Sequence, residues 1–196
     1  MAAFRNGVAE DTSFGASPQS GLPQNNRVGD IDVFAVLYMM KKLGLDPDQM
    51  AALLCSRSGL AGISGTSGDI RDLTQAVAAG DQRSRLALDV FVRAIRHYVG
   101  AFILSLGGID AITFSGGIGE NSTEIRAAVL KDLSAFGVEL DENWNRSIKG
   151  EGAISTERSP VKVLVIPANE EIIVARETVA VVGRAKAEQA MAGQAR

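Results

Sequence analysis

The chain has 196 residues, 46% of them hydrophobic and 22% charged, which is typical of one globular domain with a sizeable core. A net charge of −3 and an aromatic content of 5% argue against a nucleic-acid partner. The single cysteine, Cys55, excludes an internal disulfide and suits a reducing compartment, so we expect a cytoplasmic protein without a signal peptide.

The first 30 residues are typical of short strands and turns. Glycine, proline and asparagine gather in residues 15–26, which indicates a hairpin followed by a loop. A helix is expected over 31–43 and ends at Gly44. A second helix begins with Asp46 as N-cap and Pro47 in its first turn.

A polar, glycine-rich loop is expected over residues 58–73, followed by a long helix over 83–106 that ends at Gly107. Charged side chains within this helix argue against a membrane span. Apolar residues at Val90, Ala94, Tyr98 and Phe102 form a stripe with 3.6-residue spacing, which predicts an amphipathic helix that packs on a core.

The segment 109–122 is the most informative part of the chain. An apolar strand over 109–114 runs into three glycines within four residues, and a helix is expected over 123–136 with Asn121 as N-cap. Glycines let a backbone approach a ligand closely, and the start of a helix offers free N–H groups to an anion. The pattern alone indicates either a nucleotide site or a plain tight turn.

A β-branched run over 161–166 predicts a strand buried on both faces, and a helix follows over 172–185. Strands that alternate with helices indicate an α/β fold with a parallel or mixed sheet. Ligands of such folds bind beyond the carboxyl ends of the strands, so the glycine turn and Asn169–Glu171 are expected to face one crevice. Glu170 and Glu171 either hold Mg²⁺ there or favour the helix N-terminus.

Three charged residues in glycine-rich loops leave alternatives open. Arg27 either clamps a phosphoryl group or is a surface residue, solvated or paired with Asp30 or Asp32. Asp69 and Arg71 either contact a nucleotide or cap the helix that starts near residue 73. The only histidine, on the long helix, is expected to be solvated or paired, and one Cys and one His do not make a nucleophilic triad.

Four separated segments together resemble the acetate kinase family over residues 3–182. They occur in the family's order and near its spacing: Asn26-Arg27-Val28-Gly29-Asp30-Ile31-Asp32, Ser58-Gly59-Leu60 through Ser67-Gly68-Asp69-Ile70-Arg71-Asp72-Leu73, Phe114 through Ser122, and Ile166-Pro167-Ala168-Asn169-Glu170-Glu171 with Ala175-Arg176-Glu177-Thr178. The resemblance implies an actin-like ATPase (ribonuclease H-like) fold with a mixed sheet flanked by helices. It also implies ATP and ADP as nucleotides, Mg²⁺ as cofactor, and acetate or another short-chain carboxylate as substrate.

Site residues follow from the same resemblance, position by position. Arg27 matches the arginine that stabilises the transferring phosphoryl group, and Glu170 matches the carboxylate associated with Mg²⁺. The residues that match the nucleotide site are Asp69, Ile70, Arg71, Gly117, Ile118, Gly119, Glu120 and Asn121. Phosphoryl transfer depends on positioning and charge stabilisation, so this set suits the chemistry.

Family members are about twice this length, so the resemblance implies the C-terminal domain alone. We expect a nucleotide-binding domain over 1–185, a frayed tail over 186–196 and a missing N-terminal half that carries the catalytic aspartate and the substrate-binding arginine. The chain is then either half of an acetate, propionate or butyrate kinase, or a non-catalytic ATP-binding and dimerisation module. The family's dimers form mainly through this domain, so a homodimer is expected.

Overall fold

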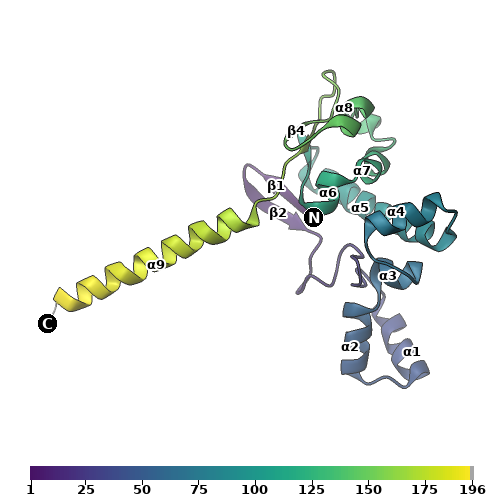
Figure 1. Ribbon diagram of the computed structural model, residues 1–196, viewed down its shortest axis with the longest axis horizontal. Coiled ribbons are helices and arrows are strands. Elements are labelled where there is room, and N and C mark those ends of the chain that lie inside the picture. The colour runs from purple at the N-terminus through teal and green to yellow at the C-terminus, as the bar shows by residue number, and fades with distance from the viewer. Residues whose placement is uncertain (195–196) are drawn as a thin grey trace.

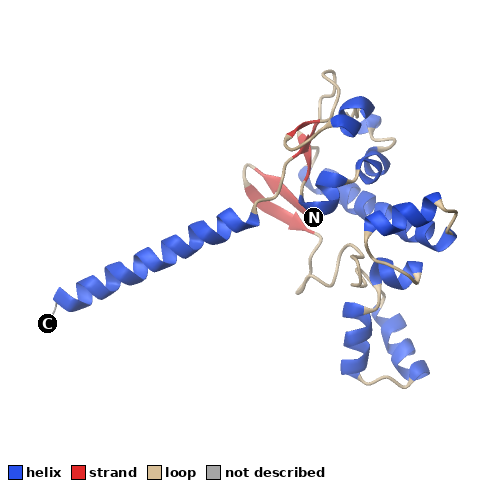
Figure 2. Cartoon of the chain, in the orientation of Figure 1, coloured by secondary structure: helices blue, strands red, loops and turns tan. Residues whose placement is uncertain are grey.

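The computed structural model describes the backbone of residues 1–194 and the side chains of residues 1–184. Figure 1 shows the elements in chain order, and Figure 2 shows that helices predominate over strands. The elements are β1 (Ala2–Arg5), β2 (Val8–Thr12), α1 (Val33–Leu43), α2 (Pro47–Ser56), α3 (Gly59–Ser64), α4 (Ile70–Ala78), α5 (Gln82–Leu106), β3 (Ala111–Phe114), α6 (Gly116–Asn121), α7 (Thr123–Leu130), a 3₁₀ turn (Ser134–Phe136), α8 (Glu142–Ser147), β4 (Gly152–Ala153), β5 (Lys162–Val165) and α9 (Glu170–Gln194).

The strands form two separate sheets. β1 and β2 make an antiparallel hairpin, as the sequence predicts. β5 lies between β3, to which it is parallel, and the short antiparallel strand β4. Val163 and Val165 are almost fully buried in this central strand. The predicted mixed sheet is therefore confirmed. The prediction that this strand is buried on both faces was wrong, because Lys162 is exposed and Leu164 is only half-buried on the face opposite Val163 and Val165.

Helix α5 supplies much of the apolar core. Its buried residues include Phe91, Ile95, Val99, Phe102 and Ile103, and all of these except Phe102 pack in one apolar cluster with residues of α7 and β5. The predicted stripe is only partly buried. Phe102 is buried, whereas Val90, Ala94 and Tyr98 each precede a buried residue by one position, are half-buried and line a separate surface hollow. Both faces of α5 are apolar, so periodicity alone does not select the face that meets the sheet.

Helix boundaries follow the expected capping chemistry at most ends. Asp46 and Gln49 form a capping box at the start of α2, and Gly44 and Gly107 end α1 and α5 in the left-handed conformation. Two expectations were wrong: residues 59–64 of the expected loop form α3, and the expected helix over 123–136 stops at Leu130. Ser122, and not Asn121, is the N-cap of α7.

Helix α9 extends away from the other elements (Figure 1). Every described side chain of this helix, over residues 170–184, is exposed. The helix continues to Gln194, and the last two residues lie outside the described part, so a frayed tail over 186–196 stays a prediction. No helix in the part of the chain that the structure describes is long and apolar enough to cross a membrane.

Candidate functional site

A cavity of about 700 Å³ separates the start of α4 from the glycine turn after β3. Its volume is within the range of small-molecule sites in proteins. Six of the eight residues predicted to bind nucleotide line it, and so do four others: the full set is Asn25, Asp69, Ile70, Arg71, Thr74, Gly117, Ile118, Asn121, Ser122 and Glu124. Folding therefore brings two segments about 50 residues apart in sequence to one hollow.

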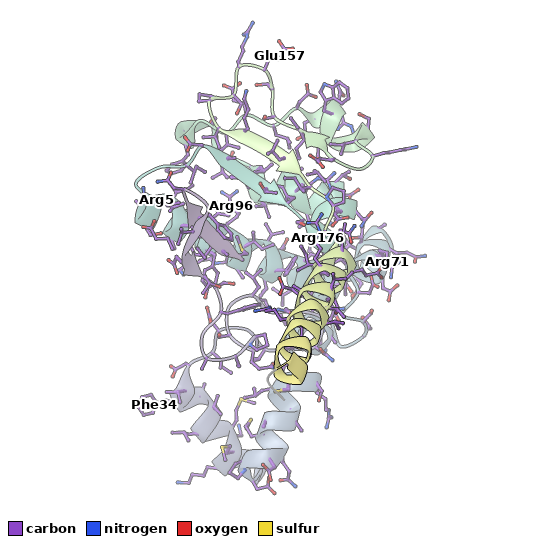
Figure 3. The ribbon with its side chains drawn as sticks, turned by 90° about the vertical axis from the view of Figure 1, so that its left-hand side faces the viewer. Arg5, Phe34, Arg71, Arg96, Glu157 and Arg176 are labelled. Atoms are coloured by element: carbon purple, nitrogen blue, oxygen red, sulfur yellow. The ribbon has the colours of Figure 1, made fainter. Side chains whose placement is uncertain are left out.

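Asp69 forms the α4 side of this cavity. Its carboxylate accepts hydrogen bonds from the backbone N–H of Arg71 at 2.8 Å and from the Arg71 guanidinium at 3.0 and 2.6 Å. The capping alternative for this pair is thus confirmed, with Asp69 as the N-cap of α4. The Arg71 side chain is 89% exposed and reaches outward in Figure 3, at the edge of the cavity.

The ion pair between Asp69 and Arg71 makes the stability of the fold depend on pH in the acid range. Hydrogen bonds from the Arg71 side chain, and then from its backbone N–H, lower the pKa of Asp69 from 3.8 to about 2. A lowered pKa means that the ionised carboxylate stabilises the fold above pH 3.8, and that this contribution disappears as the pH falls through about 2.

We expect Arg71→Met to raise the pKa of Asp69 toward 3.8 without reaching it, because the backbone N–H at position 71 remains. Carboxyl chemical shifts from an NMR titration measure this change. Arg158→Met, on an exposed loop arginine, serves as the control and leaves the Asp69 titration in place. An unchanged Asp69 pKa in Arg71→Met would show that the ion pair is absent in solution.

The glycine turn is itself helical and forms α6. Gly116 adopts a φ of +74°, which L side chains rarely adopt, at the point where β3 turns into α6. The Asn121 side chain donates back to the carbonyl oxygen of Gly117 at 2.8 Å. Gly117, Ile118 and Asn121 line the cavity, whereas Gly119 and Glu120 do not.

Glu120 instead joins the two strand ends that the sequence placed in one crevice. Its Oε1 atom accepts hydrogen bonds from the N–H of Gly116 at 2.7 Å and from the N–H of Ala168 at 2.8 Å. The bond from Gly116 links the first turn of α6 to its last turn. The bond from Ala168 links the segment after β5 to the glycine turn. The carboxyl ends of β3 and β5 are therefore held together, as the parallel pairing of these strands led us to expect.

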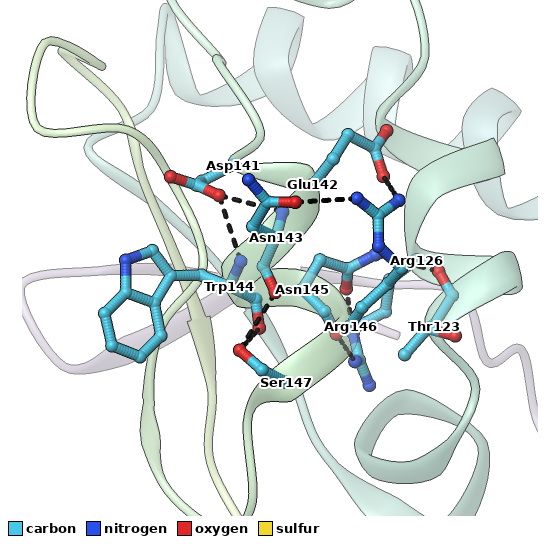
Figure 4. Close-up of polar contacts among 9 residues, drawn as sticks. All are labelled: Thr123, Arg126, Asp141, Glu142, Asn143, Trp144, Asn145, Arg146 and Ser147. Atoms are coloured by element: carbon cyan, nitrogen blue, oxygen red, sulfur yellow. Dashed lines mark hydrogen bonds and ion pairs between the residues drawn. The ribbon is translucent and has the colours of Figure 1, made fainter.

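Arg126 holds the other end of α6 and was not identified from the sequence. It is 1% exposed, and its Nη1 donates to the carbonyl oxygens of Gly119 and Glu120, both at 2.8 Å. Its Nε and Nη2 donate to the side chain and backbone oxygens of Asn145 in α8 (Figure 4). Burial lowers the pKa of this guanidinium. A signal existed, since Arg126 shares the buried face of α7 with Val129 and Leu130.

The loop that carries Arg27 is held by the start of α3. The backbone N–H groups of Ser58, Leu60 and Ala61 donate to the carbonyl oxygens of residues 26, 24 and 25, at distances between 2.8 and 3.0 Å. These carbonyls satisfy the free N–H groups of α3, whose N-cap Ser58 makes no side-chain capping bond. The loop and α3 therefore fold as one unit.

Gly59 is required for this close approach. A Cβ atom there would lie 2.1 Å from the carbonyl oxygen of Gln24 and 2.5 Å from that of Arg27, and its φ is +60°. We expect Gly59→Ala to destabilise the protein by about 2–4 kcal/mol, because left-handed backbone strain adds to a backbone clash.

Urea unfolding of Gly59→Ala measures this loss. The matched control is Gly100→Ala in α5, where an added Cβ has nothing within 4 Å. The control is expected to gain about 0.5–1 kcal/mol, because alanine favours a helix over glycine. Equal unfolding midpoints for the two variants would contradict the packing of this loop on α3.

Arg27 does not pair with Asp30 or Asp32, the two carboxylates that the sequence suggested as its partners. Asp30 accepts from the hydroxyl of Tyr98 and the N–H of Gly21, and Asp32 caps α1. Arg27 is half-buried, and among the side chains that the structure describes its guanidinium reaches only the side-chain oxygen of Gln24, at 3.5 Å. The paired alternative is therefore wrong. Arg27 does not line the cavity, although its loop neighbour Asn25 does.

Glu170 is the first residue of α9 and is exposed. It lies two residues after Ala168, which Glu120 anchors, and it does not line the cavity. Within the described residues, no three His, Cys, Asp or Glu side chains converge to hold a metal. A single carboxylate fits Mg²⁺ only where phosphate oxygens and water complete the coordination, which is the common arrangement for magnesium bound with a nucleotide.

Solved structures place this architecture in the actin-like ATPase fold. The chain superposes on the acetate kinase of Porphyromonas gingivalis with a TM-score of 0.88 and 36% identity, over 92% of this chain and 46% of that one. It superposes on a propionate kinase from Francisella tularensis with a TM-score of 0.83 and 33% identity, over 90% of this chain and 45% of that one. The expected fold class is confirmed.

Sequence comparison narrows the class to a family. The Acetokinase family matches residues 1–176, and the chain belongs to that family. It is 45% identical to the acetate kinase of Shouchella clausii over 179 residues, and 43% identical to that of Clostridium novyi over 178 residues. These alignments cover 91% of this chain but only 45% and 44% of the relatives, so the chain spans about half their length.

Proposed function

We propose that this chain is the nucleotide-binding half of an acetate kinase, and that it transfers phosphate between ATP and acetate once a second half completes the site. The observation that carries this proposal is the cavity of about 700 Å³ between Asp69–Arg71 and the glycine turn. Membership of the Acetokinase family supports the choice of reaction.

In this proposal the described residues divide the work of phosphoryl transfer. Asp69, Ile70, Arg71 and the residues 117–121 bind ATP or ADP. A carboxylate oxygen of acetate forms the new bond to the γ-phosphorus, the bond from that phosphorus to the bridging oxygen breaks, and ADP leaves. Arg27 stabilises the negative charge on the phosphoryl group in transit. Glu170 would help to hold Mg²⁺, which would supply positive charge to the phosphates when bound.

Two alternatives share the same cavity. A propionate or butyrate kinase differs only in the carboxylate pocket, and one structural relative is a propionate kinase. A non-catalytic module would bind ATP and self-associate without turnover. We favour an inactive chain when it is alone, because a nucleotide held from one side lacks the positioning of its acceptor, which supplies much of the rate. A homodimer in the cytoplasm is part of the same proposal.

A coupled ATP-formation assay from acetyl phosphate and ADP tests the proposal. The chain is assayed alone and with the other half of the Shouchella clausii acetate kinase, the part that this chain does not match, expressed as a separate polypeptide. We expect turnover only in the mixture, and acetyl phosphate to be a better substrate than propionyl or butyryl phosphate. Turnover by the chain alone would refute the proposal that a second half is needed to complete the site. No turnover in the mixture would refute the enzymatic role.

A further inference from the structure

Glu124 is a charged residue of the cavity between α4 and the glycine turn, and the sequence assigned it no role. It lies in the first turn of α7 and is exposed. Two neighbours in the lining are already engaged: the hydroxyl of Thr74 donates to the carbonyl oxygen of Ile70 at 2.7 Å, and that of Ser122 caps α7. Among the side chains described for residues 1–184, none donates to the Glu124 carboxylate or pairs with it. This carboxylate is therefore available to a ligand.

One end of the cavity lies beside the Arg27 loop and the end of β3. Asn25, in the lining, precedes Arg27 by two residues, and Gly117 follows the last residue of β3 by three. The start of α4 lies at the same end, because a Cβ atom on Gly68 would be 2.2 Å from the carbonyl oxygen of Asn25. In the proposed function Arg27 acts on the phosphoryl group, so the phosphates of the nucleotide occupy this end.

Glu124 lies further from this end of the cavity. Helix α6 leads away from β3, and Asn121 lies one helical turn beyond Gly117, about 6 Å along the axis. Glu124 follows three residues later, in the next helix. A nucleotide carries its phosphates at one end and its base at the other. With the phosphates beside the Arg27 loop, the base is therefore directed toward Glu124.

The charge of Glu124 supports the same placement. Of the two carboxylates in the lining, that of Asp69 is neutralised by the Arg71 guanidinium at 2.6 Å, whereas Glu124 has no such partner in the described part of the chain. An unpaired carboxylate beside a triphosphate would repel it, because like charges at close range raise the free energy of the complex. The uncharged base carries no such penalty, so Glu124 suits the base and not the phosphates.

We propose that the Glu124 carboxylate accepts a hydrogen bond from the 6-amino group of adenine, and that this bond makes the cavity selective for bases with such a donor. The proposal rests on the proposed function, in which the cavity binds ATP or ADP. An ionised carboxylate only accepts hydrogen bonds, and adenine presents an amino donor where guanine presents a carbonyl oxygen. A guanine nucleotide therefore loses the bond and brings a second acceptor against the first.

Stabilisation of α7 is the alternative role for Glu124. An acidic residue in the first turn stabilises the start of a helix whatever nucleotide is bound. The two roles differ in one measurable quantity, the ratio of the affinities for ATP and for purine riboside 5′-triphosphate, which lacks only the 6-amino group. A contribution to helix stability changes both affinities alike, whereas a bond to the amino group changes their ratio.

Titration calorimetry of the full chain with these two nucleotides tests the proposal. We expect ATP to bind about fivefold more tightly than purine riboside 5′-triphosphate, a modest ratio for a charge-assisted bond because Glu124 is exposed. Glu124→Ala removes the acceptor, so the ratio should fall to about one. Glu124→Gln keeps an acceptor oxygen without the charge and should give a ratio between these values, which keeps the test valid if the alanine variant fails to fold.

Glu142→Ala is the matched control, because Glu142 is an exposed acid in the first turn of α8 and does not line the cavity. Its affinity ratio should equal that of the unaltered chain. Equal affinities of the unaltered chain for the two nucleotides, or an unchanged ratio in Glu124→Ala, would overturn the proposal. ATP binding without this preference leaves the proposed function standing, whereas a failure to bind either nucleotide refutes both.

Discussion

Arg126→Ala should destabilise the protein by about 3–5 kcal/mol, because it leaves several buried oxygen atoms without a donor. The guanidinium makes four hydrogen bonds, to Gly119, Glu120 and Asn145, and it is 1% exposed. Two of these bonds hold the last turn of α6, so the glycine turn should lose its shape before the fold is lost. We expect urea unfolding to show the loss of stability, and ATP binding to weaken in parallel.

Arg146→Ala is the matched control for this prediction. Arg146 lies beside Asn145 on α8 (Figure 4), and its side chain is 62% exposed and contacts Asn143 and Glu142. An exposed ion pair of this kind contributes less than about 1 kcal/mol. Arg126→Lys should lie close to Arg126→Ala, because an ammonium group does not reproduce the planar fork of donors. A similar stability for Arg126→Ala and Arg146→Ala would contradict the structural role.

Arg27→Ala should abolish turnover in the reconstituted enzyme and leave ATP binding nearly intact. An arginine that stabilises a phosphoryl group in transit contributes about 10³-fold or more to the rate. Arg27 does not line the nucleotide cavity, so the dissociation constant for ATP should change less than about twofold. The coupled assay measures the rate, and calorimetry on the chain alone measures ATP binding.

Gly119→Val is the contrasting variant. A Cβ atom at Gly119 would lie 3.3 Å from the backbone and side chain of Phe114, so the larger side chain should displace the turn and weaken ATP binding. Arg158→Ala, at an exposed residue before β5, is expected to leave both rate and binding unchanged. Equal losses of ATP binding in Arg27→Ala and Gly119→Val would contradict the proposal that Arg27 acts on the phosphoryl group while the glycine turn binds the nucleotide.

Local sequence chemistry determined most of the elements and much of the site. Caps such as Asp46 with Gln49 and Gly107 act within one turn of chain, so they set helix ends whatever the surroundings. The β-branched run over 161–166 marked the central strand because β-branched residues favour an extended backbone, although only the face of Val163 and Val165 is fully buried. The four-segment resemblance placed Asp69, Ile70, Arg71 and the glycine turn together, and folding brings six of those residues to one cavity.

Tertiary structure alone decided which of two apolar faces of α5 is buried, and which residues hold the turn in place. Periodicity describes a helix by itself, whereas burial depends on the sheet that the helix meets. Glu120 and Arg126 act through partners that include Ala168 and Asn145, and a hydrogen bond between positions 48 or 19 residues apart leaves no local pattern in the sequence.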